Sequence, residues 1–165
     1  MRPTLLYAAA FSIFFALAGC TSEDDTPLMR PAFPESPSPF PTESDELLSD
    51  FESLSGLTIP KDAKEITITA EHVANLPVYS VRFLTSRGGA EQFCSGENFA
   101  GSYIGDTPTK ELIDKFDIKD ETVDGVVKCK GSYSNSGIVN REAVALFPSE
   151  ETVAMYVLVE KWPND

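Results

Sequence analysis

The sequence predicts an α+β fold, in which a largely antiparallel sheet of about five strands carries helices mainly on one face. Two neighbouring segments, 64–73 and 78–85, alternate apolar and polar residues, and three further strand patterns fill the C-terminal third. Helical patterns precede and separate these groups, giving the order α-β-β-α-α-β-β-β. The roughly 120 residues from 42 onward are long enough to bury a core of their own.

The first helix is predicted to begin at Thr42 or Ser44, both candidate N-caps, and to end at Gly56. Its apolar residues share one face: Leu47, Leu48, Phe51 and Leu54. Because an amphipathic helix must bury such a face, we expect it to dock on the sheet, although such a helix could also lie on a membrane surface. The acidic polar face argues against the membrane.

The segments 64–73 and 78–85 are predicted to pair as antiparallel strands across the break at 74–77. A short helix follows the run Ser86-Arg87-Gly88-Gly89. Glycines before a helix can present N–H groups to an anion, but this run matches no phosphate-binding fingerprint and favours a plain turn. Residues 95–105 are expected to be irregular, and Thr107-Pro108 predicts another helix start.

The remaining strands are predicted over 126–134, 138–147 and 152–161, the last two as a hairpin. The last strand is apolar on both sides, which is typical of a central strand that is covered twice. A single layer of helices would cover only one apolar face of this strand, so its second apolar face needs another partner. This face is therefore a candidate interaction surface for a protein or an apolar ligand, unless the first helix or a dimer covers it. Its residues are Tyr156 and Leu158, with Val144 and Leu146.

The N-terminal residues combine a basic start, an apolar segment and a small-residue run that ends in cysteine. A short start with Arg2 leads into the apolar segment Leu5–Leu17, and the run Leu17-Ala18-Gly19-Cys20 then ends in cysteine. This run resembles the lipobox of bacterial lipoproteins. The resemblance implies export, cleavage after Gly19, a diacylglycerol on the Cys20 sulfur and acylation, such as palmitate, of the new N-terminus. A membrane-spanning helix needs about 20 apolar residues, whereas Leu5 to Gly19 supplies 15.

The domain organisation follows from this signal. Residues 1–19 form the signal peptide, 20–41 a lipidated N-terminus with a proline-rich tether, and 42–165 a single domain. The stretch Thr21–Pro41 holds half of the 12 prolines and no glycine, so an extended spacer of at most roughly 65 Å is expected. The anchored domain is expected to face outside the cytoplasm, on either the cell membrane or an outer membrane.

The charge of the chain is strongly acidic. With Arg2 removed, 12 basic residues stand against 26 acidic ones, and no basic stripe is visible in the sequence. Such a chain is not expected to bind nucleic acid. Acidity of this kind is usual for a solvated surface, and recruitment of a cationic partner is the alternative.

Cys94 and Cys129 remain as an even pair once Cys20 is assigned to lipid. In a compartment that permits disulfides they are predicted to pair, with free thiols as the alternative. A zinc site that includes His72 is disfavoured, because no paired metal-ligand spacing accompanies these residues.

The sequence names no catalytic set, and whether the protein is an enzyme stays open. His72 is the single histidine, and the acidic run Asp117, Asp120, Glu121 and Asp124 lacks calcium-loop spacing. No cofactor or metal is implied. The preferred hypothesis is a non-catalytic binding or accessory protein of the cell envelope. The alternative is a small envelope hydrolase with acidic catalytic residues, which would need two carboxylates in one pocket.

Overall fold

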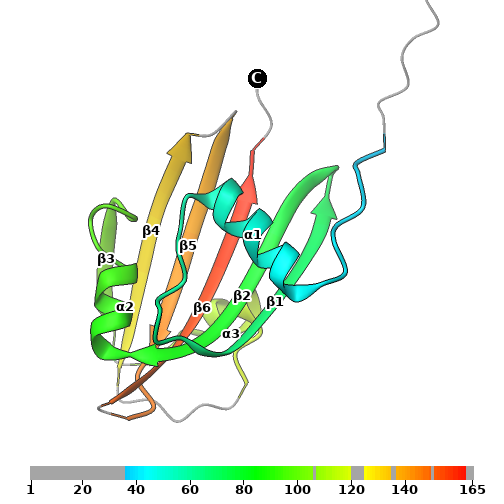
Figure 1. The fold of residues 1–165 in the computed structure, drawn as a ribbon. Helices are drawn as coiled ribbons and strands as arrows, with labels where there is room; N and C mark the ends of the chain where they lie inside the picture. Colours follow the sequence, from blue (N-terminus) through cyan, green and yellow to red (C-terminus); the bar gives the residue numbers. More distant parts are fainter. Residues whose placement is uncertain (1–35, 106, 120–124, 135–136, 150, 163–165) are drawn as a thin grey trace, which may run out of the picture. The chain divides into compact units, whose positions relative to one another are not determined.

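The computed structural model describes residues 36–105, 107–119, 125–134, 137–149 and 151–162 (Figure 1). The predicted signal peptide, Cys20 and the tether as far as Glu35 lie outside these described residues. Phe40, which the sequence placed in the tether, is packed against the domain, where its ring stacks on His72 at 4.2 Å. The domain therefore uses residues upstream of its first helix.

The described residues form one sheet of six antiparallel strands, in the order β1-β2-β6-β5-β4-β3. The predicted α+β class with a largely antiparallel sheet is confirmed. The strands are β1 (Lys64–Val73), β2 (Leu76–Ser86), β3 (Gly101–Gly105), β4 (Val126–Ser134), β5 (Ile138–Leu146) and β6 (Thr152–Lys161). The helices are α1 (Ser44–Ser55), α2 (Arg87–Phe93) and α3 (Lys110–Phe116). The doubly apolar strand β6 lies inside the sheet, between β2 and β5, as its sequence predicted.

The β1-β2 hairpin is closed by two residues with left-handed backbone. Ala74 has φ 51° and Asn75 φ 66°, and Val73 pairs with Leu76 on either side of them. Positive φ at both central positions is the mark of a type I′ turn, whose twist matches that of the strands. Near its start β1 carries an irregularity between Lys64 and Thr67, where Glu65 also has a positive φ of 51°.

The first face of the sheet packs under α1 and α2, which Figure 1 shows in front of it. Phe51 of α1, Phe83 of β2, Phe93 of α2 and Met155 of β6 are buried together there. The helix α1 ends at Gly56, which has φ 66°. A side chain at this position would stand 2.8 Å from the Tyr133 ring, so both backbone and space call for glycine.

The second face of the sheet packs under α3, which lies behind the sheet in Figure 1. The start of α3 corrects the prediction. Its N-cap is Thr109 rather than Thr107, because the Thr109 hydroxyl accepts the N–H of Leu112 at 3.3 Å.

A second correction concerns residues 95–105, of which Gly101–Gly105 form the edge strand β3. This strand is short and flanked by glycines, so its own sequence gives little strand signal. Its pairing with β4 supplies the backbone hydrogen bonds that define it.

Arg141 is a buried cation that joins three parts of the first face. Its guanidinium donates to the carbonyl of Ser55 at 3.1 Å, to the carbonyl of Asn98, and to the carbonyl of Ser132 at 3.5 Å. Burial lowers the pKa of Arg141. Its contacts tie the end of α1, the loop after α2 and strand β4 together.

Cys94 and Cys129 form a disulfide in the structure, with an S–S distance of 2.03 Å and a Cα–Cα distance of 5.8 Å. Cys94 is the C-cap residue of α2 and Cys129 is fully buried on β4, so the bond ties the end of α2 to β4.

Replacing both cysteines with alanine should destabilise the domain. The two residues are 35 positions apart, and loss of a loop closure of this size costs roughly 3.5 to 4 kcal/mol of unfolding free energy. Urea denaturation of the variant measures the loss, and reduced wild-type protein should match it. Equal stability of oxidised and reduced wild type would contradict a structural role for the bond.

Asp62 holds the start of α2 in place. Its carboxylate accepts the Thr85 hydroxyl and the backbone N–H of Ser86, each at 2.9 Å. Hydrogen bonds from the Ser86 side chain and backbone and from Thr85 lower the pKa of Asp62 from 3.8 to about 2. The charged carboxylate is therefore favoured in the folded state.

Asp62→Asn should remove an acid-dependent part of the stability. Because the folded pKa is lowered, the carboxylate stabilises the fold above pH 3.8, and this contribution is lost as the pH falls toward 2. The difference in unfolding free energy between wild type and variant should shrink over that range, measured by chemical denaturation at a series of pH values. Thr85→Val should give a smaller change of the same sign. A difference that does not vary with pH would refute the assignment.

Candidate functional site

A hollow of about 530 Å³ opens on the second face, beside the C-terminal end of α3. Strands β1, β2 and β6 form its floor, and α3 with the residues after it forms one wall. Its polar and aromatic lining consists of Thr67, Thr69, Ser80, Arg82, Lys115, Phe116, Asp117, Lys119 and Tyr156. The hollow therefore combines hydroxyl groups with three cationic side chains.

The strand register brings these floor residues together. Thr67 lies opposite Arg82, and Arg82 lies opposite Tyr156 on the next strand. Thr69 and Ser80 form the neighbouring pair. Since alternate residues of a strand share a face, the side chains of these two rows point to the same side of the sheet.

Arg82 is held in place by Tyr156. Its guanidinium carbon lies 5.6 Å from the centroid of the Tyr156 ring, and its Nε donates to the tyrosine hydroxyl at 3.3 Å. A guanidinium fixed over an aromatic ring keeps a defined orientation, and its donors suit planar or tetrahedral oxyanions.

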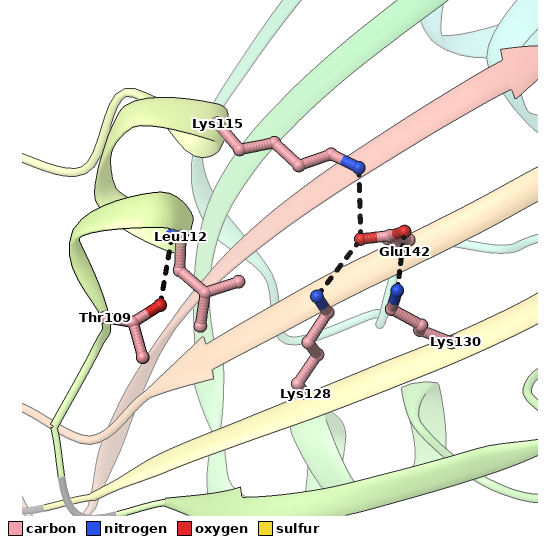
Figure 2. A network of polar contacts seen from close by, with 6 residues as sticks. All are labelled: Thr109, Leu112, Lys115, Lys128, Lys130 and Glu142. Atoms are coloured by element: carbon pink, nitrogen blue, oxygen red, sulfur yellow. Dashed lines mark hydrogen bonds and ion pairs between the residues drawn. The ribbon is translucent and has the colours of Figure 1, made fainter.

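Glu142 on β5 lies among three lysines beside the hollow (Figure 2). Its Oε2 is 3.2 Å from Nζ of Lys115 and 3.4 Å from Nζ of Lys128, and its Oε1 is 3.1 Å from Nζ of Lys130. Lys115 comes from α3 and the other two from β4. Because Lys115 also lines the hollow, the cluster and the hollow share a wall.

The charge of Glu142 is fixed by this environment. Burial by itself would raise the pKa of Glu142. Hydrogen bonds from Lys130 and Lys115, together with the charges of Lys115 and Lys128, outweigh this effect, so the pKa of Glu142 is lowered. The hydrogen bond and charge of Glu142 in turn raise the pKa of Lys130. Both shifts favour the charged forms, the carboxylate of Glu142 and the ammonium of Lys130.

Five cationic side chains lie near one another on the second face. We define the basic band as Arg82, Lys115, Lys119, Lys128 and Lys130. Among the described residues, the carboxylates of Glu142 and Asp117 lie at ion-pair distance from lysines of this band. The charge of Glu111 on α3 also acts on Lys130, and strand alternation places Glu71 and Glu160 on the same face. The cations of this face are therefore interspersed with acidic side chains.

The four residues that were expected to form an open apolar surface are buried instead. Val144, Leu146, Tyr156 and Leu158 do share the second face, but their exposed fractions are only 0%, 0%, 5% and 9%. Leu112 of α3 and Ile118 after it cover the first three. The expected cover was α1 or a second copy, whereas α1 lies on the first face. The exposed residues around these four are mostly charged or polar.

Other candidate residues do not converge on a catalytic arrangement in the part of the chain that the structure describes. His72 stacks on Phe40. Asp117 is 3.3 Å from Lys119, while Asp120, Glu121 and Asp124 lie outside the description. Asp117 is the one carboxylate among the described residues that line this hollow. A second hollow, beside α2, is lined by Asp62 and Glu97, but hydrogen bonds from Ser86 and Thr85 lower the pKa of Asp62, whereas a catalytic acid needs a raised pKa. The residues that the structure describes contain no cluster of three or more His, Cys, Asp or Glu side chains that could hold a metal ion.

Gly88 and Gly89, which were expected to form a turn ahead of the helix, lie in the first turn of α2 itself. The N–H of Gly89 donates to the Ser86 hydroxyl at 3.1 Å, which caps the helix internally. A hollow of about 580 Å³ adjoins this turn, with Lys61, Asp62 and Glu97 among its lining residues. Its charges are therefore mixed.

The basic band was missed by sequence reasoning. The outward-facing positions of Arg82, Lys128 and Lys130 could be predicted from strand alternation, and that was the available signal. What brings them to one surface is the strand order, in which β6 and β5 separate β2 from β4.

None of the helices in the described ranges has the length and apolar character that crossing a bilayer requires. The chain matches no model of a known protein family, no curated protein and no solved structure.

Proposed function

We propose that this protein is a lipid-anchored, extracytoplasmic binding protein of the cell envelope, which holds an anionic ligand in the hollow of its second face. The observation that carries the binding role is the hollow itself, whose lining combines the cationic side chains of Arg82, Lys115 and Lys119 with the hydroxyls of Thr67, Thr69 and Ser80. Guanidinium, ammonium and hydroxyl groups are the donors that carboxylates and phosphates accept most strongly.

The proposed location is supported by two independent features. The lipobox-like run ending at Cys20 provides an anchor, and the proline-rich stretch after it provides a spacer. The Cys94–Cys129 disulfide fits an oxidising compartment, where such bonds form and persist. In this arrangement the anchor carries the membrane attachment, which leaves the surface of the domain for other ligands.

The mature protein should begin at Cys20 and carry lipid. When the full chain is produced in a bacterium, intact-mass measurement should show loss of residues 1–19 and added acyl mass, and the protein should enter the detergent phase on phase separation. Cys20→Ala should remain unprocessed and unlipidated. A wild-type chain that begins before residue 20, or one without added mass, would refute the anchor.

Charge reversal at the hollow should weaken anion binding without weakening the fold. Lys119 lines the hollow and its side chain is 82% exposed, so Lys119→Glu should lower the affinity for inorganic phosphate or a carboxylate by about three- to tenfold. Chemical shift changes on titration of the mature chain, with Cys20→Ser for solubility, measure the affinity and locate the site.

Lys110→Glu provides a matched control. Lys110 is on the same helix, its side chain is 87% exposed, and it pairs with Asp114 instead of lining the hollow. This variant should bind anions as wild type does. Equal losses in the two variants would indicate a general charge effect, and shift changes away from the hollow would exclude it as the site.

A further inference from the structure

Four apolar residues stand in a row at one end of the second face. Strands β1 and β6 end there and β2 and β5 begin there, at the upper end of the sheet in Figure 1. Val73 lies opposite Leu76, and the N–H of Trp162 donates to the carbonyl of Ile138 at 2.8 Å. The β2-β6 register, continued by two residues, sets Leu76 opposite Trp162. We define the apolar rim as Val73, Leu76, Trp162 and Ile138.

The apolar rim is open to solvent. The exposed fraction is 53% for Val73, 55% for Trp162 and 58% for Ile138, while Leu76 is half-buried. Strand alternation places all four on the second face, whose other end is covered by α3. Single exposed apolar residues are normal on a protein surface. Neighbouring ones that are bordered by polar residues are typical of an interaction site.

The row next to the apolar rim is acidic. It runs from Glu71 on β1 through Val78 on β2 to Glu160 on β6. Among the residues that the structure describes, no basic side chain lies at ion-pair distance from Glu71 or Glu160. The whole chain has a formal net charge of −13. The surface that complements this end of the sheet is therefore apolar and basic.

An α-helix matches the spacing of both rows. Neighbouring strands lie about 4.8 Å apart, and successive turns of a helix lie about 5.4 Å apart. A helix across the strands can thus place one apolar residue on each strand of the rim. Glu71 and Glu160 are two strands apart, roughly 10 Å. Helix residues seven positions apart lie on the same side and are separated by about 10.5 Å.

We propose that the apolar rim, with Glu71 and Glu160 beside it, docks a basic amphipathic helix of a partner protein. The apolar stripe of that helix would lie on the rim, and two basic residues seven positions apart would pair with the two carboxylates. Amphipathic helices are commonly recognised through their apolar stripe. A second copy of this chain fits less well, because it would bring the same carboxylates and like charges repel.

This surface is separate from the anion-binding hollow. Neither the rim nor the two carboxylates are among the residues that line the hollow. The inference therefore goes beyond the proposed function and does not depend on it. A failure to bind phosphate at the hollow would leave it standing.

The fluorescence of Trp162 tests the inference directly, because this residue is the one tryptophan of the chain. The mature chain with Cys20→Ser is titrated with a tryptophan-free helical peptide that carries leucines at i, i+4, i+7 and i+11 and lysines beside them. The Trp162 emission should shift to shorter wavelength and saturate as the ring leaves water. A peptide with glutamates in place of the lysines should bind at least about tenfold more weakly.

Two isoleucines provide a matched pair of variants. Ile138 belongs to the rim, whereas Ile66 lies near the start of β1, and their exposed fractions are 58% and 42%. Ile138→Ser should weaken binding of the lysine peptide by about tenfold, since an apolar contact is lost. Ile66→Ser should bind the peptide as wild type does. Thermal unfolding checks that both variants are folded.

A second pair of variants tests the charges. Glu71→Gln with Glu160→Gln should weaken binding of the lysine peptide by about three- to tenfold and reduce its dependence on salt. Glu97→Gln is the control, because Glu97 is exposed and lines the hollow beside α2. This variant should keep the affinity of wild type.

Four results would overturn the inference. Equal binding of the lysine and glutamate peptides would exclude a basic partner. Binding of the lysine peptide without a change in Trp162 emission would exclude the rim as its site. A larger emission shift with phosphatidylcholine vesicles than with the peptide would indicate a bilayer as the occupant. A dimer in sedimentation velocity that Ile138→Ser abolishes would indicate a second copy.

Discussion

The structure depends on burying strand β6 on both of its sides. From Val153 to Val159 every residue of this strand is buried, with exposed fractions between 0% and 9%. A strand of this kind needs hydrogen-bonding neighbours on both edges and cover on both faces. β2 and β5 supply the edges, α1 and α2 cover the first face, and α3 covers part of the second.

The candidate site follows from how short α3 is. Its seven residues span about 10 Å, so the helix covers the end of the second face around Val144 and Leu146. Beside this covered part, Arg82 of β2 lies over Tyr156, and farther along the strands Glu142 with its lysines stands beside Leu158. Long charged side chains can cover apolar surface with their stems while their charged ends reach water. The same side chains therefore complete the core and form the basic band.

Local patterns were sufficient for much of the fold. The end of α1 at Gly56, the β1-β2 hairpin and the central position of β6 each follow from periodicity or turn chemistry near the residues concerned. Two features needed neighbours that the local sequence does not show. Strand β3 exists through its pairing with β4, and α3 starts at Thr109 instead of Thr107 because the later hydroxyl reaches the N–H of Leu112.

The sequence by itself determined the class of fold, the acidic character of the chain, the lipobox-like signal at Cys20 and the even pair of Cys94 and Cys129. These properties are local or additive, so they can be read without coordinates. Only the tertiary structure decided that α3 closes the apolar part of the second face and that Arg82, Lys115 and Lys130 share one surface. Strand alternation sets which way each side chain points, but strand order and register set its neighbours. Those depend on contacts between residues far apart in the chain.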